Sequence, residues 1–356
     1  MKIIDDARKV REQDPGGMYD RICDFPSQFE DALTRAAQVR LPAWNKDAIS
    51  HVVLAGLGGS AIGGDLVRSY LADGLKVPFF ICRNYTLPDF VDSSSLVFVS
   101  SYSGNTEETL SAFEDASRRS ARIICMTSNG KVEETCSREH LPCVKLPKDF
   151  QPRAALGYSF VPVLALLEKL GFVRGEEARI RKTGQFLENS KKEYQVEVET
   201  PTNPAKQLAL KLHGKLPIIY AATDHFDTVA TRWKGQFCEN AKMLAFCNVF
   251  PEFNHNELVG WKVLSDYRDD LKVVVLRDRD DHPRIKRRME IVKSIIERQK
   301  VEVIEVESSG DELLSRMFSL IQLGDFVSFY LAILNGEDPS PVKVIDHLKG
   351  ELAKGP

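Results

Sequence analysis

The sequence predicts an α/β protein of two domains, each with a doubly wound parallel sheet and flanking helices. Three observations support this fold class. Short apolar runs typical of buried strands recur about every 20 to 26 residues in the first half of the chain, with helix-type periodicity between them. The same alternation resumes in the second half, after a charged stretch. The chain has 356 residues, which at roughly 150 residues per domain suggests two domains.

Residues 1–48 are expected to form a helical lead-in, because apolar side chains recur there at spacings of three and four. Residues 49–170 form the first predicted domain. Its expected strands are the apolar runs at 51–56, 77–82, 96–100 and 122–127, and a shorter edge strand at 143–146. The connections have the length of β-α-β units, so we expect parallel strands buried on both faces.

A charged helical connector is expected at 171–200, and the second domain at 201–356. The second domain repeats the pattern of the first, with expected strands at 218–222, 244–247, 271–276 and 301–306. No residue-level repeat relates the two halves, so their similarity is one of pattern.

Charge and composition exclude several function classes. Lys and Arg total 48 against 51 Asp and Glu, a net charge of −3, and 43% of the residues are hydrophobic. This balance provides no basic surface for a nucleic acid. No uninterrupted apolar run reaches the roughly 18 residues that a membrane span needs, and charges stand near the N-terminus where a signal peptide would be apolar. We therefore expect a cytoplasmic protein without a membrane partner.

The cysteine and histidine patterns predict neither disulfides nor a metal site. The seven cysteines include no Cys-x-x-Cys spacing, and most of them lie in apolar runs, which favours buried, reduced thiols. The seven histidines include no His-Glu-x-x-His pattern.

A glycine-rich loop with Gly58, Gly59 and Ser60 follows the first predicted strand and precedes a predicted helix. Such glycines let the backbone approach a ligand closely, and a helix N-terminus offers unpaired N–H groups to an anion. The glycine spacing also fits a dinucleotide fingerprint, but Arg83 stands where that fingerprint needs an acid; it could instead face a 2′-phosphate. We favour a phosphate site without a cofactor.

A hydroxyl-rich loop with Ser101, Ser103 and Thr106 follows the third predicted strand, and Gly104 permits a tight turn there. Hydroxyls beside a helix N-terminus, at the carboxyl end of a parallel strand, suit a phosphate monoester. The alternative is that Ser103 and Thr106 only cap the following helix. One hydroxyl would suffice for capping, so the cluster favours phosphate binding.

These two loops resemble the sugar isomerase (SIS) domain, whose members bind phosphosugars. Three further motifs, at 152–158, 238–242 and 252–261, are similar to those of the bifunctional phosphoglucose/phosphomannose isomerase family. The resemblance extends from about residue 50 to the C-terminus. It implies two SIS-type domains and a metal-independent isomerase that interconverts glucose 6-phosphate and mannose 6-phosphate with fructose 6-phosphate through a cis-enediolate.

The resemblance also implies catalytic roles. Glu239 is placed as the base that moves a proton between C1 and C2, with Glu257 as the second candidate. His255 is placed as a ring-opening acid and base that the neighbouring subunit of a homodimer contributes. An imidazole suits ring opening because it titrates near neutrality. Arg153 is expected to stabilise the enediolate, because a guanidinium keeps its charge.

A ring-opening lysine on a C-terminal helix is implied as well. Lys349 is the expected residue and Lys343 the alternative, although lysines also favour the C-terminal ends of helices for electrostatic reasons. Ser340 lies where relatives carry a small polar residue that leaves room for the C2 epimer.

Two other function classes compete with the isomerase. A non-catalytic phosphosugar sensor would keep the hydroxyl loop without needing Glu239, His255 and Arg153. Residues 1–48 are too acidic for the DNA-binding segment that such sensors often carry. A nucleotide-dependent oxidoreductase would change the absorbance or fluorescence of NAD(P). An isomerase of another phosphosugar is the remaining alternative.

Overall fold

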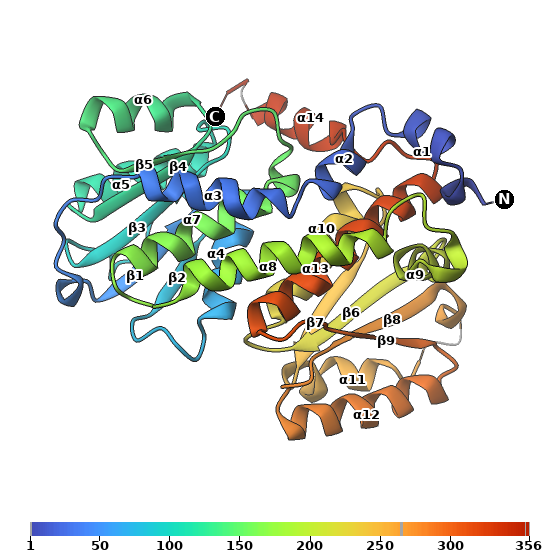
Figure 1. Ribbon diagram of the computed structural model, residues 1–356. Helices are drawn as coiled ribbons and strands as arrows, with labels where there is room; N and C mark the ends of the chain where they lie inside the picture. Colours follow the sequence, from blue (N-terminus) through green and yellow to red (C-terminus); the bar gives the residue numbers. More distant parts are fainter. Residues whose placement is uncertain (1, 264–265, 353, 356) are drawn as a thin grey trace.

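The computed structural model describes residues 2–263, 266–352 and 354–355. It contains two parallel sheets, each with helices on both faces, so the predicted fold class is confirmed (Figure 1). The first sheet has five strands in the order β2-β1-β3-β4-β5, and the second has four in the order β7-β6-β8-β9. Helices therefore form the crossover connections between the parallel strands, as the spacing of the apolar runs predicts.

The strands of the first sheet agree with the predicted runs to within about two residues at each end. They are β1 (His51–Ala55), β2 (Phe79–Cys82), β3 (Ser95–Ser100), β4 (Arg122–Thr127) and β5 (Cys143–Lys145). The helices before and within this half are α1 (Ala7–Gln13), α2 (Met18–Cys23), α3 (Ser27–Gln38), α4 (Gly59–Tyr70), α5 (Glu107–Arg118), α6 (Gly130–Glu139) and α7 (Leu156–Lys169).

The strands of the second sheet are β6 (Leu216–Ala222), β7 (Phe246–Phe250), β8 (Leu271–Arg277) and β9 (Val303–Glu307). The accompanying helices are α8 (Glu176–Ser190), α9 (Pro204–Leu212), α10 (Asp227–Glu239), α11 (Glu257–Gly260), α12 (Pro283–Arg298), α13 (Leu313–Leu334) and α14 (Lys343–Leu352). Short 3-10 helices that matter below are η3 (Pro152–Ala154) and η6 (Glu252–His255).

The strand β7 lies two to three residues later than the sequence predicts. The apolar run at 244–247 suggests a buried strand, but Leu244 is 69% exposed and Phe246 is 53% exposed. β7 is an edge strand. Its first residue, Phe246, lies at the surface of this chain, whereas its last, Phe250, is fully buried. Apolar character was therefore a poor guide to burial at this edge.

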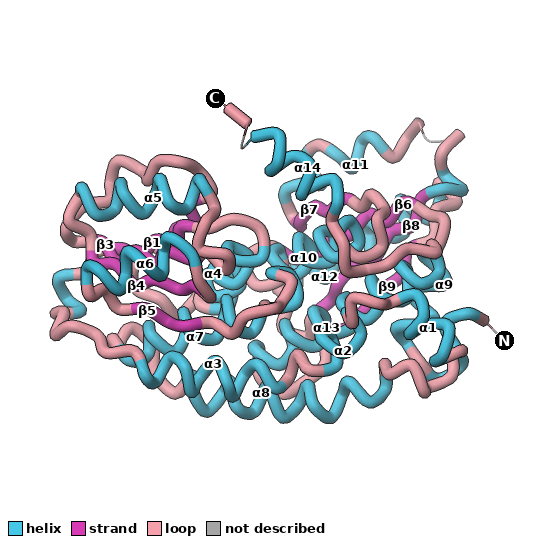
Figure 2. The backbone as a smooth tube through the Cα atoms, turned by 90° about the horizontal axis from the view of Figure 1, so that it is seen from above, coloured by secondary structure: helices cyan, strands magenta, loops and turns pink. Residues whose placement is uncertain are grey.

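One hydrophobic cluster spans both halves. Phe318 of α13 packs against Phe29 of α3 and Phe160 of α7, with ring centroids 5.1 and 4.8 Å apart. Figure 2 shows α8 on the same side of the molecule as α3, passing from the first sheet toward the second. Elements of both halves are therefore held in fixed relation where they meet.

α13 is long and apolar enough by composition to cross a membrane, and it is the one such helix among the described residues. However, 94% of its most apolar window is buried inside the protein. This burial is typical of a core helix.

Candidate active site

The glycine loop lies at the carboxyl end of β1, where α4 begins. Gly58 has a φ of +51°, in the left-handed region that other residues rarely adopt. A Cβ atom on Gly59 would lie 2.6 Å from the backbone of Pro152. The missing side chain at Gly59 therefore allows α4 to start directly against the segment that carries Arg153.

The hydroxyl loop follows β3, which neighbours β1 in the sheet. Ser101 Oγ donates to Thr106 Oγ1 at 3.2 Å, and Ser103 Oγ accepts from the backbone N–H of Asn105 at 3.3 Å. Thr106 stands at the N-cap of α5, but its side chain makes no capping hydrogen bond to that helix. Capping by Thr106 therefore does not account for these hydroxyls.

Ser60 joins the two loops. Its Oγ accepts from the backbone N–H of Tyr102 at 3.1 Å, and its carbonyl accepts from Ser100 Oγ at 3.0 Å. The two predicted substrate-binding loops thus lie side by side at the carboxyl edge of the first sheet, the usual ligand position in open α/β sheets. Arg83 forms an ion pair with Asp65, so it is engaged within the protein.

Arg153 is 5% exposed. All three nitrogen atoms of its guanidinium group contact neighbouring oxygen atoms. Its Nε donates to Asn240 Oδ1 at 2.6 Å, and its Nη2 donates to the carbonyls of Pro339 and Ser340, both at 2.7 Å. Its Nη1 lies 3.5 Å from Glu239 Oε2. Burial lowers the pKa of Arg153, which the carboxylate of Glu239 partly offsets. A guanidinium nevertheless stays protonated in proteins, so a fixed cation faces Glu239.

Glu239 is the last residue of α10, and its side chain is 36% exposed. The carboxylate is therefore paired with a buried cation while remaining accessible from outside. An accessible carboxylate beside a fixed cation suits a group that must reach a substrate. The structure thus brings together Arg153 and Glu239, two of the four predicted catalytic residues.

Lys242 is a neighbour of this pair to which the sequence analysis gave no role. Its Nζ donates to the carbonyl of Glu239 at 2.6 Å and to that of Pro339 at 3.2 Å. Burial, followed by the charge of Arg153, lowers the pKa of Lys242. Lys242 has a φ of +56°, a left-handed conformation uncommon outside glycine. Its place in the motif 238–242 could have indicated that Lys242 lies near the site. The direction of its side chain, however, depends on the left-handed backbone turn at this residue.

His255 does not lie beside Glu239 of the same chain. The segment that carries His255 packs on one face of the second sheet, where Phe253 stacks on Tyr220 with ring centroids 4.1 Å apart. α10, which carries Glu239, packs on the other face, where its Trp233 belongs to a different buried cluster. Figure 1 shows α10 and α11 on opposite sides of this sheet. His255 itself is exposed.

Glu257, the second candidate base, is engaged within the fold. Tyr220 donates its hydroxyl to Glu257 Oε1, and Asn248 Nδ2 donates to Glu257 Oε2 at 2.7 Å. Burial raises the pKa of Tyr220, and the hydrogen bond to Glu257 adds to this increase. Glu257 therefore acts as an anchor for the loop that carries His255.

Lys349 and Lys343 both lie on α14 and are exposed. The segment before α14 is attached to the site, because Arg153 binds the carbonyl of Ser340. A Cβ atom on Gly16 would lie 2.2 Å from Ser340 Oγ, so this hydroxyl packs against the N-terminal segment. α14 projects at the edge of the molecule (Figure 2).

All seven cysteines are free thiols. Three are buried, namely Cys82, Cys125 and Cys136, and the other four are half-buried, so burial is less complete than predicted. Among the described residues, no group of three or more His, Cys, Asp or Glu side chains could hold a metal ion.

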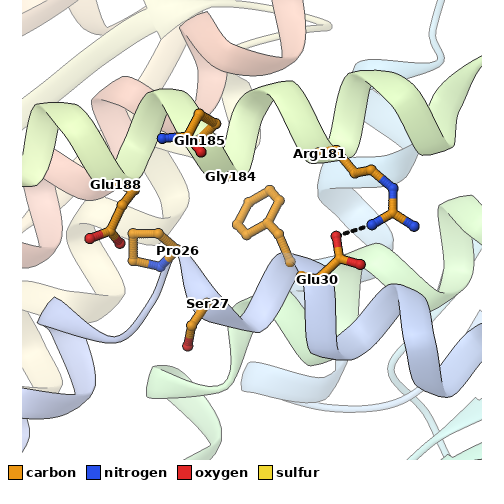
Figure 3. Close-up of a pocket in the computed structure, with 8 residues that line it drawn as sticks. Pro26, Ser27, Glu30, Arg181, Gly184, Gln185 and Glu188 are labelled. Carbon is orange, nitrogen blue, oxygen red and sulfur yellow. Dashed lines mark ion pairs between the residues drawn. The ribbon is translucent and has the colours of Figure 1, made fainter.

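A cavity of about 290 Å³ between α3 and α8 lies apart from these residues (Figure 3). Its lining includes an ion pair between Arg181 and Glu30. None of the predicted site residues lines it. We therefore assign it no part in the active site.

The paired loops and the two parallel sheets define an SIS-domain protein. The SIS domain model matches residues 48–168, and the model of the bacterial phospho-glucose isomerase C-terminal SIS domain matches residues 201–352. A solved tagatose-6-phosphate ketose/aldose isomerase from Escherichia coli has the same fold, with a TM-score of 0.70 at 14% identity over 90% of this chain and 94% of that one.

Two relatives identify the family within this class. The chain is 45% identical over 337 residues to a bifunctional phosphoglucose/phosphomannose isomerase from Caldicellulosiruptor bescii, covering 95% of this chain and 99% of the relative. It is 39% identical to one from Aquifex aeolicus, covering 85% and 90%. The chain belongs to the bifunctional phosphoglucose/phosphomannose isomerase family, which confirms the predicted resemblance, and it is an isomerase.

Proposed function

We propose that this isomerase interconverts glucose 6-phosphate and mannose 6-phosphate with fructose 6-phosphate, at a site built around Arg153 and Glu239. The observation that carries the proposal is the 3.5 Å contact between these side chains, next to the glycine loop at Gly59. A fixed cation beside an accessible carboxylate meets the two needs of an aldose–ketose isomerase, which are a base and a charge opposite the developing enediolate.

In this mechanism Glu239 takes the proton from C2 of the open-chain aldose and returns it to C1, while the hydroxyl proton of O2 passes to O1, which yields the ketose. The negative charge that develops on the enediolate oxygens faces Arg153. The phosphate group is held by the hydroxyl loop at the N-terminus of α5. The backbone N–H groups of Gly58 and Gly59 help to hold the reacting end of the sugar. Close packing between Gly59 and Pro152 supports a single site, because it joins the substrate-binding loops to the catalytic segment.

The histidine for ring opening is proposed to come from a second copy of the chain in a homodimer. The second sheet separates His255 from Glu239 of its own chain, so a complete site needs the partner. Exposed apolar side chains around β7 and α11 offer the matching surface. They are Leu244, Phe246, Val259, Val263 and Tyr267. Lys349, with Lys343 as the alternative, is the proposed second ring-opening group.

The remaining proposals concern organisation and location. We propose domain boundaries at 49–170 and 201–356, with 1–48 as lead-in and 171–200 as connector. The two family-model matches, at 48–168 and 201–352, support these limits. A location in the cytoplasm is proposed because the substrates are phosphorylated sugars of central metabolism.

The test is isomerisation by the purified protein after treatment with a chelator, assayed as fructose 6-phosphate formed from each hexose 6-phosphate. We expect activity with both sugars. Glu239→Gln should still bind substrate but lose exchange of the C2 hydrogen with solvent, since it keeps its size and loses its basicity. Glu257→Gln, at the second candidate base, should retain exchange when an open-chain substrate analogue is supplied, because the analogue bypasses ring opening. Near wild-type exchange in Glu239→Gln, or binding without turnover in the wild type, would refute the mechanism.

A further inference from the structure

We propose that Asp325 and Arg232 are positioning residues that fix the geometry of Arg153 and Glu239 from the core helix α13. This inference rests on the proposed function, because it assigns these residues to the same site. It arises from a buried polar network that connects α13 to α10 and η3.

Several buried polar residues lie on the otherwise apolar core helix α13. Gln322, Asp325 and Ser328 follow one another at every third position and are 1%, 4% and 0% exposed. Such a spacing makes each residue a neighbour of the next on the helix surface. Burying these groups is costly unless each is hydrogen-bonded. Each of them is hydrogen-bonded, and two of the three lead toward the active site.

Asp325 holds the backbone of Arg153 through Arg232. Arg232 Nη2 donates to Asp325 Oδ2 at 2.7 Å and to the carbonyl of Arg153 at 3.1 Å. The other carboxylate oxygen of Asp325 accepts from Gln236 Nε2 at 2.9 Å. Asp325 therefore fixes both the main chain of Arg153 and the turn of α10 that precedes Glu239.

Ser328 holds the guanidinium of Arg153 through Asn240. Asn240 accepts from Arg153 Nε at 2.6 Å and donates through Nδ2 to Ser328 Oγ at 2.9 Å. Ser328 Oγ in turn donates to the carbonyl of Asp325 at 2.7 Å. Gln236 lies one turn before Glu239 on α10, and Asn240 follows Glu239 directly. Both members of the catalytic pair are therefore tied to the same two residues of α13.

Stability alone does not explain a buried ion pair at this place. Replacing such a pair by apolar residues of similar volume is often neutral or stabilising, whereas breaking it leaves an uncompensated charge. The ion pair can affect the reaction rate more than the stability, because misplacing a reacting group by about 1 Å can lower the rate on the order of a hundredfold. The network is therefore best explained as a support for the catalytic pair.

The experiment compares three variants with the wild-type enzyme. Asp325→Asn weakens the support, and the double variant Arg232→Met with Asp325→Leu removes both charges. Gln322→Leu is the matched control, because Gln322 lies on the same helix but bonds Ser190 and the carbonyl of Leu187 in α8. The melting temperature of each variant is measured first. Its kcat and KM are then measured well below that temperature.

We expect Asp325→Asn to lower kcat between about tenfold and a hundredfold with KM changed by less than about twofold. The double variant should recover the melting temperature but not kcat. Gln322→Leu should lower the melting temperature with kcat within about twofold of wild type. A binding readout should agree: Asp325→Asn should lose affinity for a phosphorylated aldonate, whose carboxylate mimics the enediolate, more than for a sugar-alcohol phosphate, which lacks that carboxylate.

Two results would overturn the inference. One is a double variant that regains wild-type kcat together with its melting temperature. The other is a kcat loss in Asp325→Asn no larger than in Gln322→Leu. Arg153→Lys separates this failure from failure of the proposed function. If Arg153→Lys is inactive while Asp325→Asn and the double variant are active, only the positioning role is refuted. If Arg153→Lys retains wild-type kcat, the proposed site falls, and the positioning role with it.

Discussion

At the scale of single residues, the hydroxyl loop allows a direct test of phosphate binding. If these hydroxyls bind the phosphate as proposed, Ser103→Ala and Thr106→Ala would each remove a hydrogen bond to a charged group, worth about 1.5–3 kcal/mol. We therefore expect each to raise KM about ten- to a hundredfold. Melting temperature should change little, because the Thr106 side chain makes no capping bond to α5.

The control for this prediction is Ser137→Ala. Ser137 Oγ bonds only its own helix, donating to the carbonyl of Glu133 at 2.9 Å on the exposed surface of α6. KM should stay at the wild-type value in this variant. Unchanged KM in both loop variants would mean that the phosphate is bound elsewhere.

Residue types predicted where the candidate site lies in the fold better than they predicted the contacts within it. Gly59 and Ser60 could be recognised from their place between a strand and a helix, where phosphate sites commonly occur. The contacts of Arg153 could not be predicted, because they join segments more than eighty positions apart in sequence. The left-handed turn at Lys242 has no simple sequence signal either, since glycine is the residue that usually marks one.

At the scale of elements, the close contact between α4 and η3 leads to a second prediction. Gly59→Ala places a Cβ atom 2.6 Å from the backbone of Pro152, so α4 and the Arg153 segment must move apart. We expect kcat/KM to fall by more than about tenfold, because such shifts of a catalytic group are costly. Gly74→Ala, just beyond α4, meets nothing within 4 Å and should behave as wild type. Equal kinetics in both variants would contradict the role given to this contact.

Periodicity predicted most strands closely but misjudged the burial of β7. The interior strands β1, β3, β4 and β8 are buried on both faces, so their apolar runs ended close to the real strand limits. The edge strand β7 differs, because its apolar residue Phe246 is exposed rather than buried. The buried polar residues Asp325 and Ser328 are the opposite case. A pattern that equates polarity with exposure misses groups that are hydrogen-bonded within the core.

At the scale of the whole molecule, the proposed dimer makes a prediction about mixing. His255→Ala and Glu239→Gln chains should each be nearly inactive alone. If His255 completes the partner's site, a mixed dimer has one site with Glu239 from one chain and His255 from the other, and one site with neither. An equal mixture forms mixed dimers in about half of the assemblies, with one of two sites restored. We therefore expect about a quarter of wild-type activity after dissociation and reassembly.

The outcome distinguishes the shared site from a site within one chain. When both residues act in the same chain, every chain in the mixture lacks one of them, and no activity returns. A mixture of Glu239→Gln with Arg153→Lys is the control, because these positions lie 3.5 Å apart in one chain and should not complement each other. Sedimentation gives an independent check, since a fully active monomer would be incompatible with a sheet that keeps His255 and Glu239 on opposite faces.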